Sequence, residues 1–227
     1  METNSKVSIK ENVAHFIQKF RVFLIAFLAL IAAGIIAAAV YQEISKVNSA
    51  AMTKVIEELD AAYESTKTAK TDQEKLDSQK IFEENFAKIE KSFPGSYAAQ
   101  RGNFYQGNLK YESKDFGSAE AAFSKAALEM ETSYLAPIAL MNAAIAAEEN
   151  ANLAKAVEYL TTLSKKYSKN SPLAIRALFN LGRIAEIQKN WTSAKEAYQK
   201  LLDSYGSSSW TKLARDRIIY LKAQGLL

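Results

Sequence analysis

The sequence predicts an all-α protein in which a single N-terminal transmembrane helix precedes an α-solenoid of helical hairpins. The composition favours helices, because glycine (8) and proline (3) are scarce among 227 residues while alanine is abundant. One long apolar run lies near the N-terminus, and one pattern of small and large residues occurs three times at spacings of 37 and 38 residues. Together these observations predict one membrane crossing and one repetitive helical domain.

The apolar run is Val22–Tyr41, which contains no charged side chain. An α-helix rises about 1.5 Å per residue, so this run is long enough for the hydrocarbon core of a bilayer, which is roughly 30 Å thick. The run therefore predicts a transmembrane helix over residues 22–41 that contacts lipid. It divides the chain into an N-terminal tail of residues 1–21 and a domain of residues 42–227.

The distribution of basic residues predicts the orientation of this helix. Lysine and arginine near a crossing favour the cytoplasmic side. The tail carries Lys6, Lys10, Lys19 and Arg21. Only Lys46 and Lys54 follow within about fifteen residues of the run. We therefore expect the tail in the cytoplasm and the domain outside it, which for a bacterial inner membrane is the periplasm.

The tail itself has the pattern of an amphipathic helix. Its apolar residues follow the i, i+3, i+4, i+7 spacing that places side chains on one helical face. They are Val13, Phe16, Ile17 and Phe20. The pattern is typical of a helix that lies along the inner membrane interface and continues into the crossing. The alternative, which we favour, is an ordinary juxtamembrane helix without lipid specificity.

An alternative fate for the N-terminal region is removal as a signal peptide. Ala37 and Ala39, preceded by Gly34, resemble the small-residue cleavage site of such peptides. Cleavage there would leave a soluble periplasmic domain beginning at Val40. The apolar run is longer than the about 7–15 residues of a typical signal core, which favours a retained anchor.

The repeated pattern combines a small residue, a turn and a large residue at fixed offsets. A small residue opens each copy, an alanine follows twelve residues later, and a large residue follows four after that. The three sets are Gly107, Ala119 and Phe123; Ala144, Ala156 and Leu160; and Gly182, Ala194 and Tyr198. Between the halves lie the pairs Asp115-Phe116, Asn152-Leu153 and Asn190-Trp191. Small residues allow two helices to approach, and the large residue fills the space beside them.

This arrangement resembles the tetratricopeptide repeat (TPR), a helix–turn–helix unit. The resemblance implies three clear hairpins at residues 96–131, 134–168 and 171–206. A degenerate hairpin at about residues 50–92 precedes them, because Phe82 and Phe86 fall 37 residues before Ala119 and Phe123. Residues 208–223 are expected to form a helix that caps the end of the stack.

The repeats exceed the TPR length of about 34 residues, and the additional residues fall between hairpins. Each junction has an aromatic residue, turn residues and a serine that we expect to be the N-cap of the next helix. The junctions are Phe93 to Ser96, Tyr167 to Ser171 and Tyr205 to Ser207. Pro172 follows Ser171 where the first residue of a helix favours proline.

The residue inventory gives no catalytic, cofactor-binding or metal-binding residue, so we expect a protein that is not an enzyme and has no small-molecule substrate. His15 is the only histidine and cysteine is absent, which excludes cysteine and histidine zinc sites and cysteine nucleophiles. No phosphate loop or dinucleotide fingerprint is present. The domain carries 25 basic and 23 acidic side chains, and this near balance gives no electrostatic case for nucleic acid.

The TPR resemblance instead implies that other proteins bind in a concave groove lined by the first helices of the hairpins. Carried onto this chain, the groove positions are Arg101, Phe104, Asn108, Tyr111, Ile138, Met141, Ile145, Arg176, Phe179 and Arg183. Aromatic and arginine side chains are the residue types expected at binding hot spots. Phe104, Met141 and Phe179 have the alternative of packing between hairpins, and the arginines that of pairing with neighbouring glutamates.

The layout of the chain resembles that of the ancillary subunits of the bacterial Sec translocon, inner-membrane proteins with periplasmic repeats. That resemblance implies a membrane-tethered protein-binding scaffold or adaptor in the cell envelope, associated with the translocon or with periplasmic chaperones. Two alternatives stay open. One is a structural component of a large envelope assembly such as a motor or secretion apparatus, and the other is the soluble assembly factor produced by cleavage after Ala39.

Overall fold

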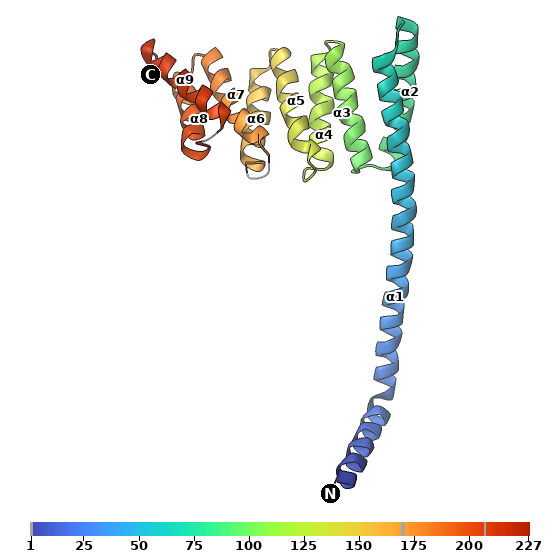
Figure 1. Ribbon diagram of the computed structural model, residues 1–227. Helices are drawn as coiled ribbons and strands as arrows, with labels where there is room; N and C mark the ends of the chain where they lie inside the picture. Colours follow the sequence, from blue (N-terminus) through green and yellow to red (C-terminus); the bar gives the residue numbers. More distant parts are fainter. Residues whose placement is uncertain (1, 169–170, 207) are drawn as a thin grey trace. The chain divides into compact units, whose positions relative to one another are not determined.

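A computed structural model describes residues 2–168, 171–206 and 208–227, and the side chains among these except those of residues 2–12, 44–46 and 48. Every regular element in this part of the chain is an α-helix, which confirms the predicted fold class (Figure 1). The helices are α1 (Glu2–Thr68), α2 (Asp72–Ser92), α3 (Tyr97–Glu112), α4 (Phe116–Glu129), α5 (Leu135–Glu149), α6 (Leu153–Lys166), α7 (Leu173–Ile187), α8 (Trp191–Ser204) and α9 (Ser209–Ala223).

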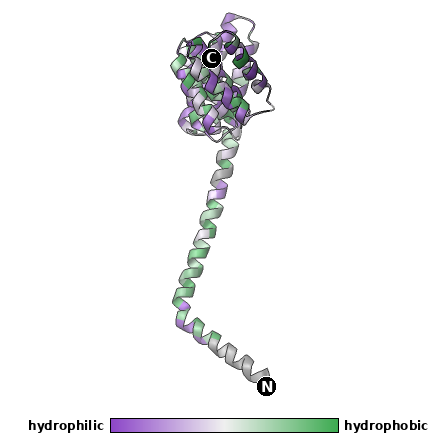
Figure 2. Ribbon diagram, turned by 90° about the vertical axis from the view of Figure 1, so that its left-hand side faces the viewer, coloured by the Kyte–Doolittle hydropathy of each residue, from purple (hydrophilic) through white to green (hydrophobic). Residues whose placement is uncertain are grey.

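The chain divides into two compact units, Met1–Lys54 and Val55–Leu227, and the single helix α1 belongs to both. In the first unit, residues Val13–Glu43 form a stretch long and apolar enough to cross a membrane, and its most hydrophobic part has no buried residue (Figure 2). A signal sequence near an N-terminus can have the same length and hydropathy, so this stretch is compatible with either a membrane span or a signal sequence. Val13, Phe16, Ile17 and Phe20 are exposed on this helix, whereas the side chain of Lys10 lies outside the described residues.

The second unit is a row of hairpins. The C-terminal part of α1 is buried against α2 and α3, with Leu59 and Tyr63 in the core. Then α3 pairs with α4, α5 with α6 and α7 with α8, and α9 covers the last pair. Thr71 starts α2 with a capping box, in which its side chain accepts from the amide of Glu74 and the Glu74 carboxylate accepts in return.

The turns within the three clear hairpins share one geometry. Asp115, Asn152 and Asn190 are the N-caps of α4, α6 and α8, and each side chain accepts a hydrogen bond from the amide three residues later. The residue before each cap has a positive φ: Lys114 (62°), Ala151 (56°) and Lys189 (55°). The polar residue of each predicted turn pair therefore starts the second helix.

The junctions between hairpins differ in their caps. Ser96 is the N-cap of α3 and accepts from the amide of Ala99, as expected. At the second junction the N-cap of α7 is Pro172, in helical conformation, and not Ser171 as expected, although the Ser171 hydroxyl accepts from the amide of Leu173 at 3.2 Å. At the third junction Ser208 is the N-cap of α9. Ser207, for which we expected this role, lies outside the described residues, as do Lys169 and Asn170 of the second junction.

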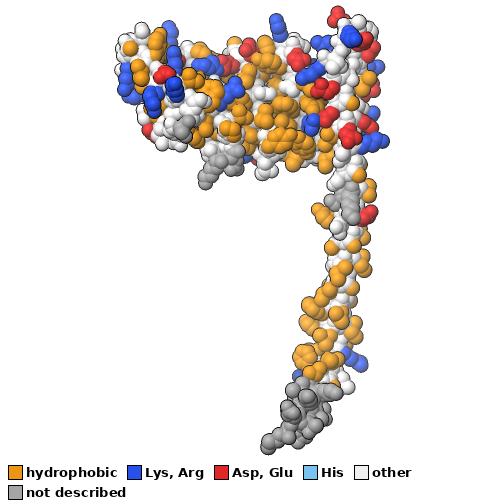
Figure 3. All heavy atoms as spheres, in the orientation of Figure 1, with side chains coloured by type: hydrophobic (Ala, Val, Ile, Leu, Met, Phe, Trp, Pro, Cys, Tyr) orange, Lys and Arg blue, Asp and Glu red, His pale blue; other side chains and the backbone are white. Residues whose placement is uncertain are grey.

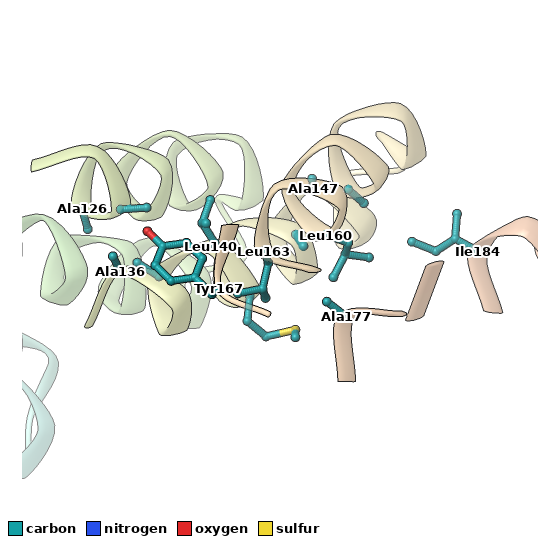
Figure 4. Packing of buried hydrophobic residues seen from close by; sticks show 14 residues of the cluster. Ala126, Ala136, Leu140, Ala147, Leu160, Leu163, Tyr167, Ala177 and Ile184 are labelled. Carbon is teal, nitrogen blue, oxygen red and sulfur yellow. The ribbon is translucent and has the colours of Figure 1, made fainter. Parts of the chain in front are cut away.

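The repeated small and large residues make the core. Ala119, Ala156 and Ala194 are fully buried, and Leu160 and Tyr198 are at most 1% exposed. Gly107 and Gly182 lie so close to the rings of Phe123 and Tyr198 that an added Cβ would come within 2.5 and 2.3 Å of a ring carbon. The middle of the core is an alanine- and leucine-rich cluster of α4, α5, α6 and α7 (Figure 4). Close helix approach is therefore built into each repeat.

Candidate protein-binding face

The helices of the second unit form two layers, and the candidate groove residues belong to one of them. The first helices of successive hairpins contact one another: the Tyr63 ring of α1 stacks on Tyr105 of α3 at 3.9 Å, and Arg183 of α7 bonds Glu148 of α5. The second helices do the same, through Tyr159 of α6 and Glu120 of α4. We call the surface of α1 from Val55 onward, α3, α5, α7 and α9 the first-helix face.

Two of the candidate arginines are tied to carboxylates of neighbouring helices. Arg183 donates two hydrogen bonds of 2.6 Å to the two carboxylate oxygens of Glu148. Arg101 lies 2.8 Å from Asp60 of α1 and donates to the Tyr105 hydroxyl at 2.8 Å. Burial raises the pKa of Tyr105 to about 12, so the hydroxyl stays protonated and can itself donate to Asp60. These arginines therefore join helices, and their charge is largely compensated before any partner arrives.

Arg176 has a different environment. Its guanidinium lies over the ring of Trp210 in α9, 5.8 Å from the ring centre, and its Nε is buried without a hydrogen-bond partner in the described structure. Phe179 lies against the same indole at 5.3 Å and against Tyr198 at 5.5 Å. Arg176, Phe179 and Trp210 thus form a half-buried cluster where α7 meets α9.

The other apolar candidates divide between core and surface. Met141 is only 2% exposed, so its side chain supports the face from below and does not line it. Phe104 is half-buried and packs edge-on against Phe123 at 5.5 Å, which makes it mainly a contact between α3 and α4. Ile138 is half-buried on α5. For Met141 and Phe104, packing between hairpins is therefore the role that the geometry supports.

Three candidates meet at a pocket. Asn108, Tyr111 and Ile145 line a cavity of about 340 Å³ between α1, α3 and α5. Tyr63, Lys67, Glu112, Phe123 and Asn142 complete its lining. Burial raises the pKa of Tyr111, and the charges of Glu149 and Glu148 raise it further. Sequence reasoning missed the residues from α1 because the first hairpin is degenerate, and it missed Asn142 because the transferred groove positions skip it.

The first-helix face offers contact chemistry of several kinds. Glu148 of the acidic pair Glu148-Glu149 is bound to Arg183. No cluster of histidine, cysteine and carboxylate side chains suited to a metal ion occurs among the described residues. In the view of Figure 3, hydrophobic side chains gather over the middle hairpins and basic ones toward the C-terminal end. Aromatic, amide and apolar groups on a rigid helical layer are suited to binding a polypeptide.

Comparison with known proteins agrees with this architecture. A family model described as a tetratricopeptide repeat-like domain matches residues 14–217. A TPR repeat-containing protein of Treponema pallidum (strain Nichols) is 29% identical over 118 residues, which are 52% of this chain and 48% of that protein. The chain therefore spans about half the length of this relative. The family match includes the apolar run as well as the hairpins.

Proposed function

The chain belongs to the tetratricopeptide repeat-like domain family, and from that premise we propose that it is a non-enzymatic scaffold tethered to the bacterial inner membrane. Repeat stacks of this kind provide protein-binding surfaces, and the face of α1, α3, α5, α7 and α9 is where this chain presents its aromatic and amide side chains. The observation that carries the tether is the exposed apolar stretch of α1, Val13–Glu43, for which water is an unfavourable solvent.

The more specific proposal concerns the localisation of the protein and its partners. The tail carries four of the basic residues near the crossing, which supports a cytoplasmic N-terminus and a periplasmic stack. The resemblance of the layout to ancillary translocon subunits supports an association with the translocon or with periplasmic chaperones. The rival roles, a permanent part of an envelope assembly or a soluble factor released by cleavage after Ala39, make different predictions for the mature chain.

The tether is tested on the mature protein from native membranes. The intact mass should include the tail, and carbonate washing should leave the protein in the membrane pellet. A mature chain that begins at Val40 and appears in the soluble fraction would establish the cleaved form.

The binding face is tested by photo-crosslinking in the same membranes. A benzophenone amino acid at Tyr220, which is 50% exposed on α9 of the first-helix face, should trap partner proteins that mass spectrometry then identifies. The matched control is Leu128, which is 67% exposed on α4 in the other layer. Equal trapping from both positions would move the binding site away from the first-helix face. Stoichiometric trapping of one large complex would favour the structural role over a transient scaffold.

A further inference from the structure

Successive first helices are joined by ion pairs at one repeated position. In the register of the repeat, Arg183 directly follows the small residue Gly182, and Glu148 lies four residues after the equivalent Ala144. Glu186 stands four residues after Gly182 and accepts two hydrogen bonds from Arg217 of α9. The fourth residue after the small residue is thus a glutamate that holds the next first helix, once between α5 and α7 and once between α7 and α9.

Between α3 and α5 this connection is replaced by a pocket. The same two register positions there are Tyr111, four residues after Gly107, and Ile145, directly after Ala144. Neither side chain carries a charge, and both line the 340 Å³ cavity. The ion pair that joins α5 to α7 and α7 to α9 therefore has no counterpart at these two positions between α3 and α5. A pocket with aromatic and aliphatic walls lies there instead.

The pocket has the size and lining for one bulky side chain. Ligand pockets span about 300 to 1,000 Å³, so this one lies at the small end of the range. Phe123 of α4 contributes an aromatic wall, and the Asn142 amide contributes a polar group. The Asn108 amide donates to the Tyr63 hydroxyl at 3.1 Å, which fixes the orientation of both walls.

The charge around the pocket is unbalanced. The Lys67 ammonium group lies over the Tyr63 ring, 4.8 Å from the ring centre, and interacts electrostatically with the carboxylates of Glu112 and Glu64. Glu149 and Glu148 act on Tyr111, and Glu148 is neutralised by Arg183. The carboxylates of Glu112 and Glu64 near Lys67 and of Glu149 near Tyr111 outnumber this one ammonium group, so a cationic group of a ligand gains from the field.

We propose that the pocket binds a bulky apolar side chain, with phenylalanine as the best case, from an extended protein segment that carries a lysine or arginine beside it. The proposal rests on the protein-binding role proposed above and names the chemistry of the partner. The apolar side chain displaces water from the walls formed by Tyr111, Ile145 and Phe123, and the adjacent cation lies near Glu112 and Glu149.

Three probe peptides test this chemistry on the full chain in lipid nanodiscs. They are dye-labelled Gly-Ser-Gly-Phe-Lys-Gly-Ser-Gly and its counterparts with Ala-Lys and Phe-Glu at the centre, measured by fluorescence anisotropy. Burial of the phenylalanine ring should give the Phe-Lys peptide a Kd about tenfold below that of the Ala-Lys peptide. The Phe-Glu peptide should bind about two- to fivefold more weakly than Phe-Lys at low salt, because exposed ion pairs contribute little. Equal Kd values for the three peptides would overturn the proposal.

Variants locate the binding. Asn142→Phe should fill the pocket and weaken Phe-Lys binding about tenfold. The matched control is Asn180→Phe. Asn180 stands two residues before Gly182, as Asn142 stands two before Ala144, but it lies where Arg183 and Glu148 join α7 to α5. This control should leave the Kd unchanged. Because a core-facing substitution can impair folding, the exposed Glu112→Lys provides a second test: it should abolish the preference for Phe-Lys over Phe-Glu, and Glu84→Lys on α2 should not.

The two proposals fail in different ways. If photo-crosslinking from the first-helix face traps partners but Asn142→Phe and Asn180→Phe bind the Phe-Lys peptide equally, the pocket inference is wrong and the scaffold role stands. If no protein is trapped from that face, yet the Phe-Lys peptide binds and Asn142→Phe alone removes binding, the pocket is real and the proposed scaffold role is wrong.

Discussion

The apolar run of α1 and the helix α5 have similar compositions but opposite surroundings. Both are rich in alanine, leucine and isoleucine, and α5 has no charged residue before Glu148. In α5, 10 of the 15 residues are buried, whereas in the run large side chains such as Phe23 and Leu30 are both 71% exposed. Composition alone therefore does not decide whether an apolar helix is covered by its own chain.

The difference lies in length and in the placement of small residues. The alanines of α5 fall at the register positions where α4, α6 and α7 approach, so neighbouring helices fill its surface. The run of α1 carries bulky side chains on all sides of the helix and continues over 20 residues without a charge. A helix that is apolar all round needs an apolar medium, which α5 has inside the stack and the run requires from a membrane.

The largest effect should come from a charge placed in α5. Ala143 is fully buried between α4 and α5, so Ala143→Arg would bury an unpaired cation and destabilise the stack by more than about 4 kcal/mol. Thermal melts followed by circular dichroism on the full chain in detergent measure this. The control Ala151→Arg, at an exposed turn position, should change stability by about 0.5 kcal/mol or less. A folded Ala143→Arg protein with an unchanged melt would show that α5 is not in the core.

The same substitution in the run should act on membrane insertion and spare the stack. Arginine at the centre of a crossing costs about 2.5–3.5 kcal/mol on insertion scales, so Ala29→Arg with Ala33→Arg should release the protein on carbonate extraction. Ala50→Arg with Ala51→Arg, at exposed positions beyond the run, is the matched double control and should remain in the pellet. If both doubles stay in the pellet, the run does not anchor the protein by crossing the bilayer.

An intermediate effect is expected where glycine permits close approach. A methyl group at Gly182 would meet the Tyr198 ring, so Gly182→Ala should destabilise the stack by about 1–3 kcal/mol despite the better helix propensity of alanine. In the apolar run, no atom lies within 4 Å of a Cβ built on Gly34. Gly34→Ala should therefore leave the melt of the stack unchanged. A stabilised Gly182→Ala variant would contradict the close packing of α7 and α8.

The sequence predicted the fold because the repeat register is local. The spacing between Gly182 and Tyr198 lies within one hairpin, and the turn caps Asp115, Asn152 and Asn190 act over three residues. The partners of the arginines could not be predicted in the same way. Arg101 pairs with Asp60, 41 positions earlier in a hairpin that has lost the repeat pattern.

The pocket escaped prediction for a related reason. It exists because Tyr111 and Ile145 occupy positions where other repeats carry a joining charge, and the pairing of these positions across hairpins is visible only in three dimensions. The exposure of Met141 and Phe104 was likewise undecided, because one face of a first helix serves both the core and the surface. Register in the sequence predicts which residues meet within a hairpin, but not how neighbouring hairpins meet.

The smallest expected effect on stability comes from a charged residue of the stack, Glu186. The apolar run of α1 has no charged residue. Burial raises the pKa of Glu186, but hydrogen bonds from Arg217 and Tyr198 outweigh it, and the net pKa lies below its usual value. Its contribution to stability is therefore complete above the unfolded pKa of about 4.3 and is lost as the pH falls through the lower, folded value. We expect Glu186→Gln to destabilise the stack by about 1–2 kcal/mol at neutral pH and by less in acid.

Melts at a series of pH values test this sign. The free-energy difference between the original chain and Glu186→Gln should be constant near neutrality and shrink below about pH 4, because the protonated carboxyl then resembles the amide. Glu84→Gln, at an exposed position on α2, should run parallel to the original chain throughout. Carbonate extraction should be the same for all three proteins, because both substitutions lie outside the apolar run of α1. A difference that grows in acid would mean that Glu186 is protonated in the folded stack and acts as a hydrogen-bond donor, so that the connection between α7 and α9 is not an ion pair.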